Sequence, residues 1–284
     1  MNKDKPIVAL LYDFDKTLCT KDMQEYQFIP RLGMKAKEFW QKSNGLARAQ
    51  GMDSVLAYMY TMIREAQSEE QPVRREDFVA MGKTVEFFPG VLDWFSRINA
   101  YGESQGVTIK HYIISSGLRE IIEGSAISSV FDKIYACEFH YNASGVADWP
   151  KSVVNYTTKT QFLFRINKGV LDVSDDSSVN NYVEEDDRPV PFRNMIYFGD
   201  GMTDVPCMKL VYVNGGKSIA VYNRRKGVVA EELIRQGRVH YMAVADYREG
   251  KELADLVKAI IHQMAATNAL VRKTKQQQDK LIKK

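Results

Sequence analysis

The stretch that decides the fold covers residues 7–18 and reads Ile-Val-Ala-Leu-Leu-Tyr-Asp-Phe-Asp-Lys-Thr-Leu. Its apolar first half predicts a buried strand, and Asp13, Asp15 and Thr17 follow where that strand should end. Because side chains alternate along an extended chain, Asp13 and Asp15 should point to the same side. Two carboxylates this close together need a cation or a shared proton. At this edge of an α/β sheet one acid could act as a nucleophile while its neighbour carries protons; a solvated turn is the alternative.

A second strand-like run also ends in polar residues. Residues 109–114 are mostly β-branched or aromatic, and they lead into Ser115, Ser116 and Gly117 ahead of a helical pattern. A hydroxyl and backbone N–H groups at the start of a helix can bind an anion. A simple helix cap is the alternative interpretation of this segment.

A third run, residues 194–198, leads into two more aspartates, Asp200 and Asp204, which are accompanied by two glycines. The glycines permit a tight backbone, so both aspartates can face a bound ion or phosphate. A glycine turn with an aspartate that caps the next helix is the alternative. Together with the two aspartates of the first run, these oxygen ligands favour Mg²⁺.

Lys159 begins a helical pattern that Gly169 can end. The first turn of a helix is electrostatically unfavourable for a cation. This placement therefore indicates a specific role, namely neutralising a phosphate and a nucleophilic carboxylate. Lys168 is the alternative, but it lies at the favourable end of the same helix and needs no further role.

The four segments, taken in order, resemble the four motifs of the haloacid dehalogenase (HAD) superfamily. The resemblance rests on Asp13-Phe-Asp15-Lys-Thr17, Ser115, Lys159 and Gly199-Asp200-Gly-Met-Thr-Asp204, and it covers residues 7–20 and about 85–250. It implies an α/β fold with a doubly wound parallel sheet, that is, a Rossmann-like core. An acid two residues after the nucleophile is typical of the phosphatase branch, so Asp15 implies a phosphohydrolase.

The resemblance also implies a mechanism. Asp13 would attack phosphorus to give an aspartyl phosphate, and Asp15 would first protonate the leaving oxygen and then activate water. Mg²⁺ would be the cofactor, and its ligands would be Asp13, the backbone carbonyl of Asp15, Asp200 and Asp204, the last either directly or through water. The remaining catalytic roles would fall to Lys159, which neutralises charge, to Ser115, which bonds a phosphoryl oxygen, and to Thr17, which orients the phosphoryl group or the nucleophile.

Residues 21–84 separate the first motif from the rest of the core, residues 1–20 and 85–284. Their apolar residues recur at helical intervals, which predicts an inserted helical cap domain, as in the phosphoserine-phosphatase-like branch. Asp22 occupies the position at which those enzymes bind the substrate amino group, so Asp22, together with Ser116 and Gly117, is predicted to bind substrate. The arginine that those enzymes use for the carboxylate has no clear counterpart, although Arg48 or Arg64 could serve.

The amino-acid composition argues against some classes of protein but does not indicate a function by itself. The 284 residues contain no apolar run near the roughly 20 residues of a membrane span. Three scattered cysteines and the lack of room for a secretion signal before residue 7 predict a cytoplasmic location. Residues 272–284 carry a net charge of +5, whereas the whole chain carries +3. The rest of the chain is therefore not basic, which argues against a nucleic-acid-binding surface there. Residues 172–187 hold seven acids and no base, which favours a solvated loop over a partner- or ion-binding segment.

These observations predict that the protein binds a small phosphorylated metabolite and binds neither nucleic acid nor a membrane. The predicted function is Mg²⁺-dependent hydrolysis of a small phosphomonoester. A phosphotransferase that uses the same aspartyl phosphate is one alternative. A non-catalytic binding protein with the same fold is another, although the intact acids and Lys159 argue against it.

Overall fold

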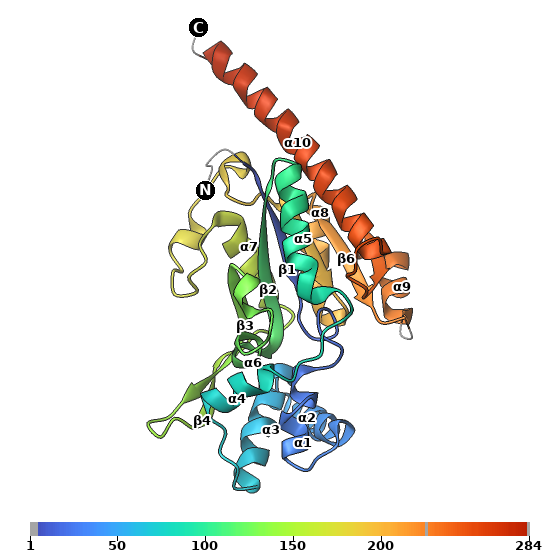
Figure 1. The fold of residues 1–284 in the computed structure, drawn as a ribbon. Helices are drawn as coiled ribbons and strands as arrows, with labels where there is room; N and C mark the ends of the chain where they lie inside the picture. The colour runs from blue at the N-terminus through green and yellow to red at the C-terminus, as the bar shows by residue number, and fades with distance from the viewer. Residues whose placement is uncertain (1–4, 225–226, 283–284) are drawn as a thin grey trace.

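The protein is described by a computed structural model that covers residues 5–224 and 227–282 (Figure 1). Its centre is a seven-stranded sheet with the strand order β4-β3-β2-β1-β5-β6-β7. All neighbouring strands are parallel except β3 and β4, which are antiparallel. The strands are β1 (Ile7–Tyr12), β2 (Thr108–Leu118), β3 (Lys133–Tyr141), β4 (Ala147–Ser152), β5 (Met195–Gly199), β6 (Lys217–Tyr222) and β7 (Tyr241–Val244).

The central position of β1 follows from its sequence. Every residue from Val8 to Tyr12 is fully buried, as an apolar strand covered on both faces requires. Tyr12 pairs in register with Ile113 of β2 and with Phe198 of β5. The segments that follow these three positions therefore meet at one edge of the sheet.

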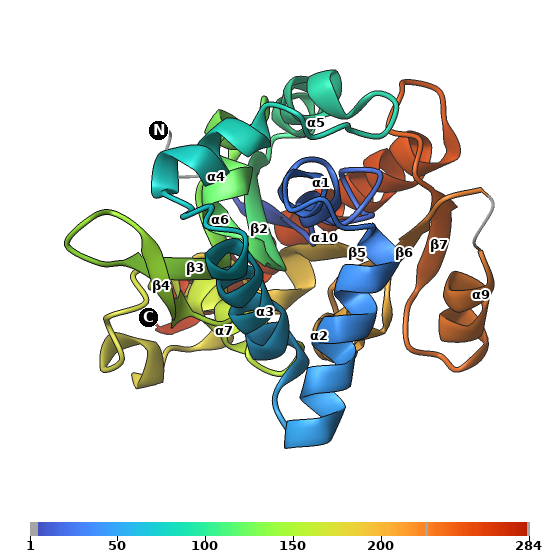
Figure 2. The ribbon, with the colours of Figure 1, turned by 90° about the horizontal axis from the view of Figure 1, so that it is seen from below.

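Helices cover both faces of the sheet, which confirms the predicted doubly wound α/β fold. Figure 2 shows α5 (Val91–Ser104) and α10 (Glu252–Ile282) on one side of the strands and α7 (Lys159–Lys168) on the other. On the second face α7 packs beside α8 (Val205–Val213). The remaining core helices are α6 (Arg119–Glu123) and α9 (Val228–Arg235). The C-terminal half of α10 extends beyond the body of the protein (Figure 1).

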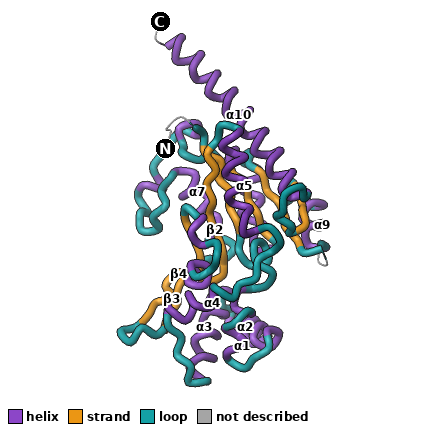
Figure 3. Tube along the Cα trace, in the orientation of Figure 1, coloured by secondary structure: helices purple, strands orange, loops and turns teal. Residues whose placement is uncertain are grey.

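A group of helices covers the edge of the sheet where the motif segments meet. These are the 3-10 turn η1 (Met23–Glu25) and the helices α1 (Phe28–Arg31), α2 (Ala36–Gln50), α3 (Ser54–Ser68) and α4 (Arg75–Gly82), which come between β1 and α5 in the chain. Figure 3 shows α1 to α4 together below the sheet. Their core is aromatic: Phe28 stacks on Phe78 at 5.9 Å between ring centroids and meets Phe39 edge-on at 6.4 Å. We call residues 21–84 the cap.

The antiparallel hairpin of β3 and β4 is a feature that the sequence did not predict. The hairpin extends the sheet and also packs against the cap. Phe139 of β3 stacks on Phe78 of α4 with 5.4 Å between ring centroids, and the Ala147 N–H donates to the Val73 carbonyl. The β4 segment, Ala-Asp-Trp-Pro-Lys-Ser, contains a proline and no β-branched residue, so it carries little strand signal. A proline is tolerated there because β4 is an edge strand.

Within the part of the chain that the structure describes, no helix is both long and apolar enough to span a membrane.

Candidate active site

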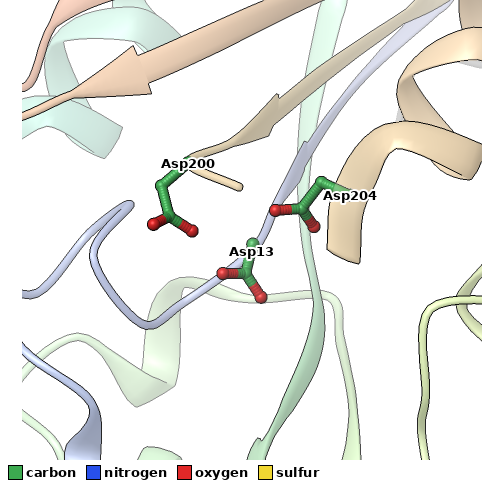
Figure 4. A group of neighbouring side chains, drawn as sticks. All are labelled: Asp13, Asp200 and Asp204. Carbon is green, nitrogen blue, oxygen red and sulfur yellow. The ribbon is translucent and has the colours of Figure 1, made fainter. Parts of the chain in front are cut away.

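Three carboxylates gather at the carboxyl edge of the sheet. Asp13 follows β1, Asp200 follows β5, and Asp204 ends the 3-10 turn η6 (Met202–Asp204) that leads into α8. One oxygen from each lies within 4.8 Å of an oxygen from the other two, and Figure 4 shows the three groups together. The Asp13 backbone N–H donates to the Phe198 carbonyl at 2.9 Å, which fixes the end of β1 against β5.

Lys159 lies between two of these carboxylates. Its Nζ donates to Asp13 Oδ1 and to Asp204 Oδ1, both at 2.8 Å, and the side chain is only 1% exposed. The lysine is the first residue of α7, so the helix start delivers its cation to the end of β1. Lys168 instead bonds the carbonyls of Val179 and Asn181, in the acidic segment, away from the site.

Close packing behind Asp204 requires a glycine. A Cβ on Gly199 would lie 2.5 Å from Asp204 Cγ, so only glycine leaves room for the carboxyl group at the end of β5. Tyr197 donates its hydroxyl to Asp204 Oδ1 at 2.8 Å. Asp204 Oδ1 thus accepts from two donors, Lys159 and Tyr197, whereas Asp13 Oδ1 accepts from Lys159.

Burial dominates the electrostatics of the site. It raises the pKa of Asp13 to about 6, against the lowering effect of Lys159. It also raises the pKa of Asp200 well above its usual range, with further contributions from Asp13 and Asp204. For Lys159, burial alone would lower the pKa, but its two carboxylate partners raise it above the ordinary value. Three acids against one buried lysine leave an excess of negative charge, so the donor set fits an oxygen-preferring cation such as Mg²⁺.

Asp15 connects the core to the entrance of the cap. Its Oδ1 accepts a hydrogen bond from the Met23 backbone N–H at 2.9 Å. Burial, followed by the nearby charges of Asp22 and Asp13, raises the pKa of Asp15 well above its usual range. The raised pKa makes the protonated form of Asp15 more accessible, which is the direction that a general acid requires.

The other predicted residues lie around this centre. Ser115 is fully buried, and its Oγ accepts the Gly117 backbone N–H at 2.9 Å, so these two predicted phosphate contacts bond each other in this structure. Thr17 is also buried, and its hydroxyl is without a hydrogen-bond partner among the described residues. Ser116 lines the cavity between core and cap.

That cavity has a volume of about 310 Å³ and contains both the acids and part of the cap. Asp22 lines it and forms an ion pair with Lys16, with 2.5 Å between Nζ and Oδ2. As the residue before η1, Asp22 makes no side-chain capping bond to that turn. Arg48 and Arg64 are not among the described residues that line the cavity, and both are exposed.

Sequence reasoning missed several residues of this cavity. The clearest are Lys16, Gln24, Trp40 and Tyr58. Lys16 lies inside the first motif, and its positive φ of 57° marks an unusual turn that a lysine at this position does not predict. The other three come from the cap. The sequence placed Trp40 on an apolar helix face and favoured a core position for Tyr58, with an apolar substrate wall as the alternative; it gave no signal for Gln24. Tyr58 in fact donates its hydroxyl to the Ser116 carbonyl at 2.6 Å and so ties α3 to β2.

The model of the haloacid dehalogenase-like hydrolases matches residues 10–209, which include every acid of the site and Lys159. The chain belongs to this family. An uncharacterized protein of Borreliella burgdorferi is 29% identical to this HAD-family chain over 282 residues, which cover 89% of this chain and 96% of the relative.

Solved structures share the fold of this HAD-family chain at low sequence identity. A substrate-bound phosphoserine phosphatase complex aligns with a TM-score of 0.57 and 13% identity, over 90% of this chain and 99% of that one. A structure described as a phospho-aspartyl intermediate analogue of phosphoserine phosphatase aligns with a TM-score of 0.53 and 15% identity, over the same shares of the two chains. These likenesses extend the agreement in fold from the core to the capped arrangement as a whole.

Proposed function

We propose that the protein is a Mg²⁺-dependent phosphohydrolase that acts on a small phosphomonoester, with Asp13 as the nucleophile. The observation that carries the proposal is the position of Asp13 on the cavity, where the buried Lys159 holds one of its carboxylate oxygens. A carboxylate oriented in this way can attack phosphorus and form an aspartyl phosphate. The structural neighbour described as a phospho-aspartyl intermediate analogue is consistent with this chemistry.

Charge is the main obstacle to this attack, because an ionised carboxylate repels a phosphate dianion. Lys159 reduces the repulsion, since its buried cation touches Asp13 directly. Mg²⁺ would be held by Asp13, Asp200 and the backbone carbonyl of Asp15, and when bound it supplies further positive charge to the transferring phosphoryl group. Asp204, whose Oδ1 already accepts from Lys159 and Tyr197, would orient the lysine and a water.

Asp15 would supply the proton that the leaving oxygen needs. Its raised pKa favours the protonated form before the first step, and its bond to the Met23 N–H holds the carboxyl group at the boundary of core and cap. After the proton has passed to the leaving group, the carboxylate of Asp15 can accept a proton from the attacking water. The cap would exclude bulk water during these steps.

The experiment is to measure hydrolysis of para-nitrophenyl phosphate with Mg²⁺ and with a chelator, for the natural sequence and for Asp13→Asn. We expect turnover that requires Mg²⁺ and that falls by more than about 10³-fold in the variant, because an amide is a poor nucleophile. Asp93→Asn is the control, since the Asp93 side chain lies on the exposed side of α5, where it pairs with Arg97 away from the cavity. Undiminished activity of Asp13→Asn would falsify the mechanism.

A further inference from the structure

The cavity has a second half, which would receive the leaving group of a bound phosphate ester. We call it the leaving-group pocket, and the residues of its lining on which the inference rests are Asp22, Gln24, Trp40, Asn44, Tyr58 and Ser116. All but Ser116 come from the cap. The whole cavity of about 310 Å³ is near the lower end of the range for small-molecule sites, so a phosphate and a short substituent would fill it.

The leaving-group pocket offers no uncommitted charge. Of the described residues that line the cavity, only Lys16 and Lys159 are cationic, and both belong to the core. Lys159 is bonded to two acids, and Lys16 is paired with Asp22 at 2.5 Å. A substrate carboxylate would therefore find no free cation. A substrate ammonium would find Asp22 already neutralised by Lys16.

Two residues that line the pocket each carry a buried polar atom that lacks a partner, which favours a neutral hydrogen-bonding ligand. Gln24 is 1% exposed, and its Oε1 has no hydrogen-bond partner among the described residues. The hydroxyl oxygen of Ser116 is buried and unpartnered in the same sense. Leaving such groups unsatisfied is unfavourable, so we expect both side chains to turn toward a ligand that can bond them. An amide oxygen can only accept a hydrogen bond, which a substrate hydroxyl would donate.

Aromatic rings complete the wall. Trp40 and Tyr58 meet edge-on, with 6.0 Å between ring centroids, and their polar atoms are already bonded to Glu25 and to the Ser116 carbonyl. What the two rings can offer a ligand is therefore apolar surface. Such surface suits the carbon skeleton of a compound whose hydroxyls are directed at Gln24 and Ser116.

On these grounds we infer that the substrate is the phosphate ester of a small uncharged polyol, such as a glycerol phosphate or a sugar phosphate, and not the phosphate of an amino acid or an amine. This inference rests on the proposed phosphatase function. Three observations identify the leaving group: the buried amide oxygen, the aromatic wall and the pairing of Lys16 with Asp22.

The test compares kcat/KM for four compounds in the presence of Mg²⁺: glycerol 3-phosphate, phosphoserine, phosphoethanolamine and para-nitrophenyl phosphate. We expect glycerol 3-phosphate to exceed both phosphoserine and phosphoethanolamine by at least about tenfold, since each charged group would lose its solvation without gaining a partner. A preference for phosphoserine or phosphoethanolamine, with para-nitrophenyl phosphate also hydrolysed, would overturn this inference alone. Absence of turnover on all four compounds would overturn the proposed function as well.

A variant tests the role of the buried amide. In Gln24→Met the ratio of kcat/KM for glycerol 3-phosphate to that for para-nitrophenyl phosphate should fall about 2- to 12-fold, the worth of one neutral hydrogen bond. Gln27→Met is the matched control, because Gln27 belongs to the same segment but is exposed and lies outside the described lining of the cavity. An unchanged ratio in Gln24→Met would remove Gln24 from the pocket's recognition of hydroxyls and contradict the inference.

Discussion

The two halves of the cavity are built on different physical principles. The core half consists of buried ionised or ionisable groups that bond one another, with Lys159 between Asp13 and Asp204. Apart from Asp22, which is paired with Lys16, the cap half offers neutral polar atoms and aromatic rings, represented by Gln24, Trp40 and Tyr58. The core half comes from residues at strand ends and helix starts, whereas the cap half comes from helices that pack above them.

This difference separates reaction from selectivity. Charges that stabilise a phosphoryl group act on any phosphate ester, so the core half cannot tell one ester from another. In the proposed function, the hydrogen-bonding groups and the shape of the cap half would meet only the leaving group and would therefore discriminate between esters. The following predictions test this division, beginning with the largest effect.

Lys159→Met should damage both activity and stability, because it leaves Asp13 and Asp204 buried without their cation. We expect activity on every phosphate ester to fall by more than about 10²-fold, and the free energy of unfolding to fall by about 3 to 5 kcal/mol. Urea unfolding and para-nitrophenyl phosphate assays measure the two effects. Lys168→Met, at the other end of α7, is the control and should keep full activity. A loss restricted to one ester would contradict the division between the two halves.

Asp15→Asn should distinguish good from poor leaving groups. An alkyl phosphate needs a proton on its leaving oxygen, so its kcat should fall by about 10²- to 10⁴-fold, whereas an aryl phosphate should lose about tenfold or less. Parallel assays with glycerol 3-phosphate and para-nitrophenyl phosphate give the comparison. Equal losses on the two compounds would count against Asp15 as the general acid and would place its role with the cap contact to Met23.

A buried network behind β1 tests whether the stability of the core can be separated from the charges of its site. Trp94 donates to the Tyr12 hydroxyl, which lies 3.1 Å from His111 Nδ1, and His111 Nε2 lies 2.9 Å from Asn99 Oδ1. Burial lowers the pKa of His111 to about 4 from its ordinary 6.5. As pH falls, His111 takes up its proton in the unfolded chain before it does so in the folded protein. The contribution of neutral His111 to the free energy of unfolding is therefore fully present above pH 6.5 and is lost toward pH 4.

The expected loss is about 3 kcal/mol of unfolding free energy between pH 7 and pH 4. It should be measured as the difference in pH dependence between the natural sequence and His111→Gln, since the carboxylates of the site titrate equally in both. Identical pH profiles for the two proteins would show that His111 does not titrate in this range.

Asp22→Asn should have the smallest effect, and only on selectivity. Because Lys16 already offsets the charge of Asp22, a contact with a substrate hydroxyl should be worth an ordinary hydrogen bond. The kcat/KM ratio of glycerol 3-phosphate to para-nitrophenyl phosphate should therefore fall about 2- to 12-fold. If activity on both substrates falls equally and the melting temperature drops, Asp22 stabilises the loop by pairing with Lys16 and does not contact the substrate.

Much of the core could be predicted from sequence because its signals are local. The strand that ends at Asp13, the helix that begins at Lys159 and the turn around Asp200 and Asp204 each lie within a dozen residues, and the structure brings all four side chains together. Parallel strands end at one edge of the sheet, so strand ends far apart in sequence must meet there. The fold and the family were confirmed; the catalytic roles of these residues remain predictions.

The β3–β4 hairpin and the lining of the cap could not be predicted in this way. Helical periodicity identified apolar faces in residues 21–84, but it gives Tyr58 and Trp40 the same signal whether they fill a core or face a cavity. Pairing of Lys16 with Asp22 depends on a backbone turn with positive φ, which neither residue type predicts.

The sequence by itself thus determined which acids and which lysine stand at the edge of the sheet, because strand alternation and helix ends follow from residues that are neighbours in the chain. Only the tertiary structure decided that Gln24 is buried with an unsatisfied amide oxygen and that Tyr58 ties the cap to Ser116. These properties depend on how the cap packs against β2 and the hairpin, and packing between distant segments is not encoded in any local pattern.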